Sequence, residues 1–218
     1  MNAKSSILAR IRAAQGGNVA RAAAEPAAAE TYLAAHPPGP RPAAHRDPLE
    51  GFIGRAQSLS TTVARVARAA DVPQAVARYL NAHDLPLRAA CWPACAALDW
   101  RAAGMVVEPR PASGDDLVGI TGAYCAIAET GTLMMLSGAD TPAETSLLPE
   151  THVAVVAESR IVRDMEDAWA LLRAEQGATV MPRAVNFISG PSRTADIEQT
   201  LVLGAHGPYR VHIVLTSA

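Results

Sequence analysis

The feature that most constrains the fold is the alternation of short apolar runs with helix-like segments from Leu49 onward. The run 153–157 (VAVVA) contains no polar residue, which is typical of a parallel strand covered on both faces. The segment 164–175 follows it, and its apolar residues recur at helical spacing. Strands that alternate with helices of this length predict an α/β fold, built in three layers around a mostly parallel sheet.

The same two patterns predict the other strands and helices. Pro73 falls in the first turn of a predicted helix over 72–80, where proline is favoured. The block 117–136 contains two apolar strand-like pieces, one on each side of the turn Glu129-Thr130-Gly131. The remaining predicted elements are a helix at 49–58 and strands at 61–66, 87–91, 104–108, 185–188 and 211–215.

Residues 1–48 differ in composition from the rest of the chain. An amphipathic helix is predicted at 5–14, and the alanine-rich segment 19–36 is interrupted by Pro26. Five prolines between residues 37 and 48 exclude a regular element there. We therefore expect a helical arm with its connector over 1–48 and an α/β domain over 49–218.

Charge and hydropathy exclude several classes of partner. The formal net charge is −2 and no block of like charge occurs, so neither nucleic acid nor an anionic membrane is expected as a ligand. No apolar run reaches the roughly 18 residues of a membrane span. The N-terminus lacks the unbroken apolar segment of a secretory signal, and a plain first helix is favoured over an organelle transit peptide. The expected location is the cytoplasm.

The cysteine pattern predicts neither disulfides nor a metal site. The three cysteines, Cys91, Cys95 and Cys125, are odd in number, and CWPAC lacks a second cysteine pair that would complete a metal or cluster site. No histidine pair has zinc-site spacing. The glycine-rich motifs for dinucleotides and nucleoside triphosphates are absent, as is G-x-S-x-G. We expect buried, inert thiols and no cofactor or metal bound by this chain.

One cluster of polar residues follows the predicted strand 185–188. It contains Ser189, Gly190, Ser192, Arg193 and Thr194. A helix is expected to start near Thr194, with Thr194 as its N-cap and Asp196 and Glu198 as ordinary first-turn acids. Arg193 is not explained by that arrangement, because a guanidinium beside helix-start amides suits a carboxylate or phosphate. Ligands of open α/β sheets bind beyond the carboxyl ends of the strands, which is where this cluster is expected.

A second cluster surrounds the turn at Glu129. A carboxylate in an apolar block must be exposed, lie in a cleft or be hydrogen-bonded, so Glu129 is either a hairpin-turn residue or a cleft acid, base or nucleophile. Thr130 and Thr132 flank Gly131 and offer hydroxyls to a small polar ligand. His206, in a glycine turn, is a third candidate with structural and functional roles equally supported. A structural role is favoured for His152, at the amino end of its predicted strand.

Three motifs in order carry a family resemblance: AIAETGTLMML (126–136), SLLPETHVAVV (146–156) and FISGPSRTADIEQTLVLGAHGPYRVHIVL (187–215). The region from Leu49 to Ser217 resembles the LUD-domain family, and within it the lactate utilization protein C branch. The resemblance implies a fold similar to the superfamily of ribose-5-phosphate isomerase, glucosamine-phosphate deaminase and CoA-transferases. The arm is only weakly matched.

The resemblance also implies a function. It suggests a cluster-free subunit of a cytoplasmic system that oxidises L-lactate to pyruvate, beside partner subunits that carry iron–sulfur clusters. By analogy of fold alone, Glu129 matches the loop carboxylate and Arg193 the anion-binding turn of the superfamily. Two alternatives stay open: a scaffold that only stabilises the partners, and an enzyme acting on a sugar phosphate or an acyl-CoA.

Overall fold

The computed structural model describes residues 3–14, 19–37, 39–40, 47–177, 180–197 and 200–217. Two compact units make up the chain, Met1–Arg41 and Pro42–Ala218. The first unit contains helices α1 (Ala3–Ala14) and α2 (Val19–Ala35). None of the described helices is long and apolar enough to cross a membrane.

The predicted interruption at Pro26 is wrong, because α2 continues through this residue. A proline inside a helix removes one backbone hydrogen bond and costs about 3 kcal/mol. Alanine has the highest helix propensity of all residues, and alanines flank Pro26 on its C-terminal side. The flanking residues therefore keep the helical conformation despite the proline.

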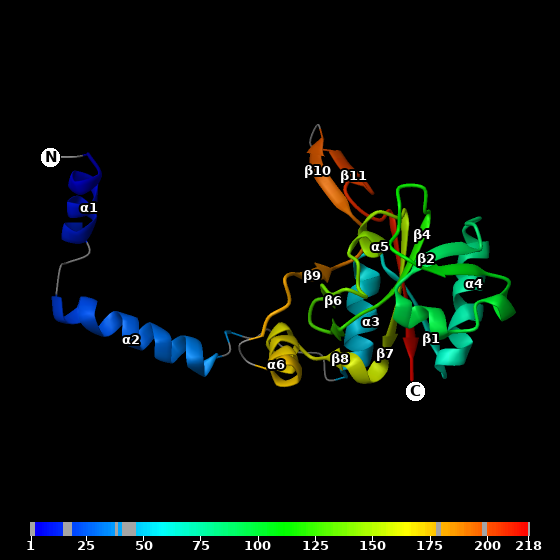
Figure 1. Ribbon diagram of the computed structural model, residues 1–218, viewed down its shortest axis with the longest axis horizontal. Helices are drawn as coiled ribbons and strands as arrows, with labels where there is room; N and C mark the ends of the chain where they lie inside the picture. Colours follow the sequence, from blue (N-terminus) through cyan, green and yellow to red (C-terminus); the bar gives the residue numbers. More distant parts are fainter. Residues whose placement is uncertain are drawn as a thin grey trace. The chain divides into compact units, whose positions relative to one another are not determined.

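The second unit is built on a six-stranded sheet with the order β1-β12-β7-β4-β2-β3, in which every pair of neighbours is parallel (Figure 1). The predicted α/β fold with a mostly parallel sheet is confirmed. The strands of this sheet are β1 (Thr62–Val66), β2 (Arg88–Cys91), β3 (Val106–Pro109), β4 (Val118–Gly122), β7 (Thr151–Ala157) and β12 (Arg210–Thr216).

A second sheet of four strands has the order β8-β5-β6-β9. Strand β6 pairs antiparallel with β5 and β9, whereas β5 and β8 are parallel. The block 117–136 thus forms three strands instead of the predicted two, because β4 belongs to one sheet and the hairpin β5–β6 to the other. The strands are β5 (Cys125–Ile127), β6 (Thr132–Leu136), β8 (Ile161–Val162) and β9 (Val185–Ile188).

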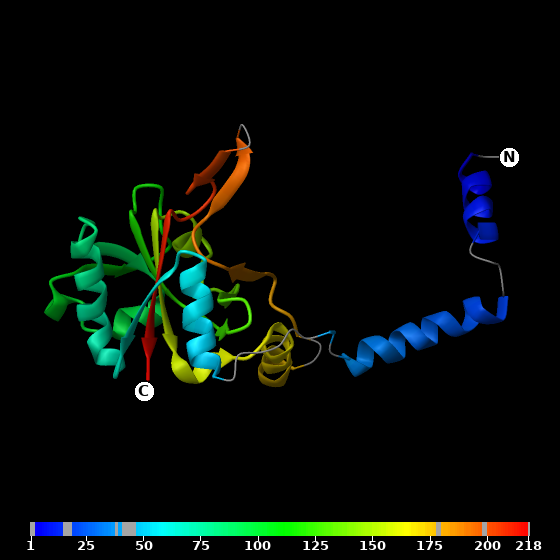
Figure 2. The same cartoon turned by 180° about the vertical axis from the view of Figure 1, so that it is seen from behind.

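Helices cover both sheets. Helix α4 (Val72–Ala82) packs on one face of the six-stranded sheet, while α3 (Pro48–Ser58) packs on the other face together with the second sheet (Figures 1 and 2). Helix α6 (Met165–Gln176) covers the outer face of the second sheet. The short elements are α5 (Glu144–Leu147) and 3-10 turns at Ala69–Asp71, Pro93–Ala97, Arg101–Ala103 and Glu158–Arg160.

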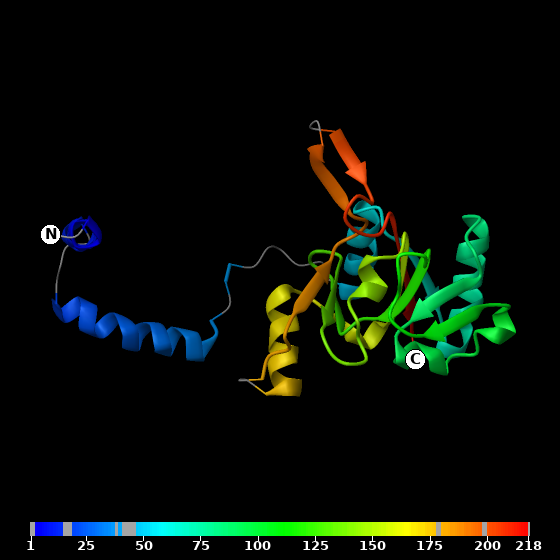
Figure 3. The same ribbon diagram turned by 45° about the horizontal axis from the view of Figure 1, so that its top comes forward.

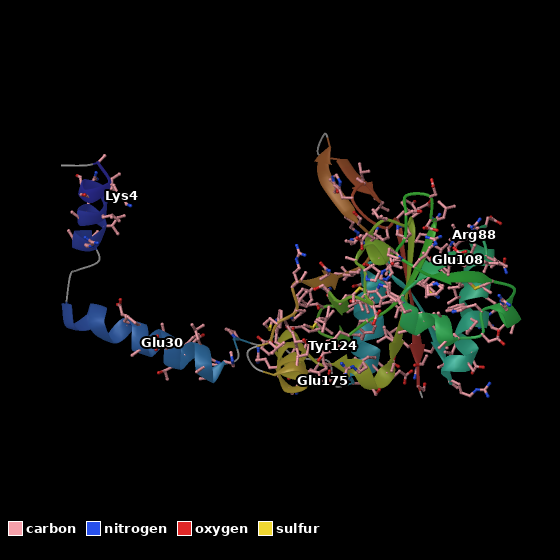
Figure 4. All side chains as sticks on the ribbon, in the orientation of Figure 1. Lys4, Glu30, Arg88, Glu108, Tyr124 and Glu175 are labelled. Carbon is pink, nitrogen blue, oxygen red and sulfur yellow. The ribbon has the colours of Figure 1, made fainter. Side chains whose placement is uncertain are left out.

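Polar side chains cap the N-terminal ends of α3 and α6, and hydrogen bonds to Glu175 attach α6 to the rest of the domain. Asp47 accepts a hydrogen bond from the amide of Leu49 at the start of α3, and Asp164 accepts one from Asp167 at the start of α6, both at 2.9 Å. Glu175, near the end of α6, accepts hydrogen bonds from Arg160 and from the hydroxyl of Tyr124, each at 2.6 Å (Figure 4). These two donors hold the pKa of Glu175 at about 2.

A hairpin of β10 (Arg193–Ile197) and β11 (Thr200–Leu203) projects from the domain (Figure 3). It lies at the amino edge of the six-stranded sheet, opposite the edge where β12 and the chain end (Figures 1 and 2). This edge becomes important because the polar cluster 189–194 leads into the hairpin.

Candidate functional site

Two glycine turns lie against the last turn of α3. Gly131 has a φ of 65°, and a Cβ atom there would lie 2.6 Å from the backbone nitrogen of Ala56. Gly190 has a φ of 80°, and its Cβ would lie 2.5 Å from the carbonyl oxygen of Leu59. Both approaches are too close for any side chain. The two predicted clusters, far apart in sequence, therefore meet at the C-terminal end of one helix.

Hydroxyl groups from the two turns contact each other directly. Thr132 Oγ1 and Ser189 Oγ lie 2.6 Å apart, and Thr132 also donates a longer hydrogen bond of 3.4 Å to the carbonyl oxygen of Thr130. Thr132 is buried, and the buried hydroxyl of Thr130 has no hydrogen-bond partner in the described part of the chain. An unpaired buried hydroxyl is costly.

Arg193 is exposed and lies at the end of α3, where its guanidinium and Gly190 are both close to the carbonyl oxygen of Leu59. Its Nη2 donates to the carbonyl oxygen of Leu59 at 2.9 Å and to Ser60 Oγ at 2.7 Å. A guanidinium has five N–H donors, and those on Nε and Nη1 make no hydrogen bond to the described residues. Arg193 also forms no ion pair with the part of the chain that the structure describes. Part of its hydrogen-bonding fork therefore faces solvent.

The other candidates of this cluster lie along the start of the hairpin. The amide of Ser192 donates to the carbonyl oxygen of Pro208, and its own carbonyl accepts from Gly204, both at 2.9 Å. Thr194 is buried and pairs with Val202 across the hairpin. His206 is exposed in the turn before β12, and the neighbouring Gly207 packs against the side chain of Ser192.

The helix predicted from Thr194 is wrong, because strand β10 occupies its place. The β-branched Thr194 and Val202 face each other in the hairpin register, and such residues favour strands. Asp196 is therefore not a first-turn residue of a helix, and Glu198 lies outside the described residues. Within the described part of 193–203 no helix begins beside Arg193. An anion at Arg193 would rely on the guanidinium and the nearby hydroxyls alone.

The predicted edge of the sheet is also wrong. Arg193 binds Leu59 and Ser60, which lie shortly before the start of β1, and Ser192 binds Pro208, which lies shortly before the start of β12. These contacts define the amino edge of the parallel sheet. The rule that ligands bind beyond the carboxyl ends of parallel strands does not apply to this cluster. Strand β9, which precedes the cluster, belongs to the second sheet and is antiparallel to β6.

Glu129 lies at the end of β5, as a half-buried residue of the predicted turn. Its amide donates to the carbonyl oxygen of Arg163 at 2.9 Å, and its Oε2 accepts a long hydrogen bond of 3.4 Å from the amide of Met165. Glu129 therefore faces the first turn of α6, whereas Arg193 is held by the end of α3. The two residues share no hydrogen-bond partner among the described residues.

Two buried histidines lie in the central strands. His152 Nε2 is 2.8 Å from Thr121 Oγ1, and burial lowers the pKa of His152 to about 4. His212 stacks on Tyr79 at 3.8 Å between ring centroids, and burial together with nearby His83 lowers its pKa to about 4. Both are neutral core residues at pH 7, as expected for His152.

The three cysteines are free, and they are buried as predicted. Burial raises the pKa of Cys91 and Cys125 to about 11 and that of Cys95 to about 12. Such thiols are protonated at pH 7, and thiolates are the form that binds metals. Among the described residues, no group of three or more His, Cys, Asp or Glu side chains could hold a metal ion.

A family model described as the LUD domain matches residues 99–216, more than half of the chain. The chain belongs to the LUD domain family. The matched part of this LUD domain includes every candidate from Glu129 to His206. It does not include Leu59 and Ser60, the partners of Arg193, and no local pattern in the sequence pointed to them.

Relatives of this LUD domain protein include lactate utilization protein C from Bacillus subtilis (strain 168), 43% identical over 102 residues, and from Geobacillus sp. (strain WCH70), 42% identical over 101 residues. The alignments cover 46% and 45% of this chain, but only 42% of the length of each relative. A solved structure of a DUF162 family protein from Deinococcus radiodurans is also similar. It aligns with a TM-score of 0.59 at 25% identity, over 81% of this chain and 100% of that one.

Proposed function

We propose that this LUD domain protein takes part in lactate utilization, as the cluster-free subunit of a cytoplasmic system that oxidises L-lactate to pyruvate. In this proposal it handles the small carboxylate substrate beside partner subunits that carry iron–sulfur clusters. Relatives named lactate utilization protein C, about 40% identical over nearly half of the chain, support the pathway. The observation that carries the binding role is the exposed guanidinium of Arg193, at the same end of α3 as the contact between buried Thr132 and exposed Ser189.

The site offers complementary groups for a 2-hydroxy acid. A free donor of Arg193, on Nε or on Nη1, would bind the carboxylate, because hydrogen bonds between a guanidinium and a carboxylate are charge-assisted. Thr130, Thr132 and Ser192 would bind the hydroxyl of lactate or the carbonyl oxygen of pyruvate. The unpaired hydroxyl of Thr130 would gain a partner when the ligand binds.

Oxidation of lactate to pyruvate removes two electrons and two protons. In our proposal Glu129 accepts the proton of the substrate hydroxyl while the C2–H bond breaks. The two electrons of that bond pass one at a time to the clusters of the partner subunits, and its proton passes to a base of those subunits. One carboxylate oxygen of Glu129 makes no hydrogen bond to the described residues and is able to accept that proton. Substrate must then approach from the side where α6 begins.

Titration with L-lactate tests the binding role. The wild-type protein should be stabilised against thermal unfolding, and Arg193→Ala should bind at least roughly tenfold more weakly, since a hydrogen bond to a charged group contributes about 1.5–3 kcal/mol. Arg101→Ala, at an exposed arginine in another part of the domain, is the matched control and should behave as wild type. Equal L-lactate shifts in the wild type and Arg193→Ala would contradict the assignment.

A second candidate function, a scaffold for the partner subunits, is favoured by the first compact unit. All described side chains of α1 are exposed, and the aliphatic Ile7, Leu8 and Ile11 are 56%, 38% and 46% exposed. Isolated helices of this length are marginal in water, so α1 is suited to packing against another surface. Deleting residues 1–41 should then abolish co-purification with the partners and leave L-lactate binding intact.

A further inference from the structure

The connection between α3 and β1 is ordered by a set of backbone hydrogen bonds. The amides of Leu59 and Thr61 both donate to the carbonyl oxygen of Ala56, at 3.0 and 3.1 Å, and the amide of Ser60 donates to Gln57 at 2.9 Å. Ser60 has a φ of 68° within this turn. The residue at this position of a helix cap is usually glycine, and a serine in the left-handed region is less favourable than glycine.

The left-handed turn directs the Ser60 side chain toward Arg193. Ser60 Oγ accepts from Arg193 Nη2 at 2.7 Å, and the carbonyl oxygen of Leu59 accepts from the same nitrogen at 2.9 Å. One nitrogen of the guanidinium is thus held by two acceptors, which restricts the orientation of the planar group. The donors on Nε and Nη1 make no hydrogen bond to the described residues, and they lie on different edges of the guanidinium, on either side of Nη2.

The left-handed conformation of Ser60 is explained by the cap of α3, because the bonds from Thr61 to Ala56 and from Ser60 to Gln57 form a Schellman motif. The side-chain bond between Ser60 and Arg193 is not part of that cap. It is exposed, and exposed polar contacts contribute little to stability. This bond therefore suggests a role for Ser60 in orienting Arg193.

We infer that Ser60 is a positioning residue, which holds the guanidinium of Arg193 so that a free N–H donor on Nε or Nη1 is presented to the carboxylate of the substrate. The inference rests on the proposed function, because it assigns Ser60 a role in the same binding site. It also extends that site to the α3–β1 connection, outside the matched residues 99–216.

Four variants separate positioning from stability. Ser60→Ala removes the acceptor and keeps the backbone strain. Ser60→Gly removes the acceptor and relieves the strain, since glycine adopts positive φ freely. Ser60→Asn restores a side-chain acceptor on a residue that tolerates this conformation. Ser58→Ala is the matched control, because the Ser58 hydroxyl bonds only to Arg55 in its own helix.

The measurement is the thermal unfolding of the full chain, titrated with L-lactate. Ser60→Ala and Ser60→Gly should bind roughly fivefold more weakly, the effect of losing about 1 kcal/mol. Ser60→Asn and Ser58→Ala should bind as wild type. Without lactate, the Tm of Ser60→Gly should equal or exceed that of the wild type, although its binding is weaker.

Two results would overturn the inference and leave the proposed function standing. The first is unchanged lactate binding in Ser60→Gly while Arg193→Ala binds lactate weakly. The second is weaker lactate binding in Ser60→Gly together with a Tm as low as that of Ser60→Ala. The second result would mean that Ser60 has a purely structural role. If Arg193→Ala itself binds L-lactate as the wild type does, the binding role and the inference fail together.

Discussion

The hydroxyl oxygens of Thr132 and Ser189 lie 2.6 Å apart, although 57 positions separate the two residues in the chain. This contact joins the start of β6 to the turn that follows β9, and both turns rest on the last turn of α3. The candidate site is therefore assembled by the packing of the second sheet against α3.

The hydroxyl pair should be coupled energetically. Thr132→Val and Ser189→Ala should each reduce the free energy of unfolding by about 1 kcal/mol, because each leaves the other hydroxyl without its partner. The double variant should lose less than the sum of the two single variants, with a coupling energy of about 0.5–1.5 kcal/mol. Urea unfolding of the four proteins measures it, and strict additivity would mean that the hydroxyls do not interact.

The close approach of the glycine turns to α3 predicts that alanine substitutions at different glycines change the free energy of unfolding by different amounts. Gly131→Ala and Gly190→Ala should each destabilise the fold by more than about 2 kcal/mol, because both the positive φ and the missing space oppose a side chain. Gly104→Ala, with a positive φ of 74° but open space, isolates the backbone cost of about 1 kcal/mol.

The helical Gly54, which has open space and no positive φ, completes the series. Gly54→Ala should stabilise the fold by up to about 1 kcal/mol, since alanine is the better helix former. Equal effects of alanine at Gly131 and Gly104 on the free energy of unfolding would show that contact with α3 does not restrict the turn.

The buried histidines predict loss of stability in weak acid. His152 and His212 have pKa values of about 4 in the fold, against about 6.5 when unfolded, so the unfolded chain binds more protons between these values. Stability should therefore fall as the pH drops from 7 toward 4, by about 2 kcal/mol per histidine between pH 7 and pH 5. In His152→Gln the loss of unfolding free energy between pH 7 and pH 5 should be smaller by the contribution of one histidine. An unchanged pH profile of unfolding would exclude His152 as a cause.

Most strands could be predicted from local pattern. The apolar run 153–157 became part of β7 in the middle of the six-stranded sheet, where both faces are covered. The division of 117–136 between two sheets could not be predicted, because an apolar block does not reveal which sheet each strand joins. The hairpin after Arg193 was also missed, since its carboxylates resemble those at the start of a helix.

The candidate site was only partly predictable. The turns at Gly131 and Gly190 were recognised because glycine and hydroxyl residues interrupt apolar runs. Their meeting at α3, and the contact of Arg193 with Ser60 from 133 positions away, depend on tertiary packing. A single sequence carries no local signal for such contacts.

Reduction of a dye by L-lactate tests the proposed function most directly. The purified iron–sulfur partner subunits would be assayed with and without this chain, and then with Glu129→Gln, Arg193→Ala or the Arg101→Ala control. We expect rapid dye reduction only with the wild-type chain or the control, and at least a tenfold lower rate with either site variant, since every tenfold corresponds to about 1.4 kcal/mol. Equal rates with and without the chain would contradict its role in handling the substrate.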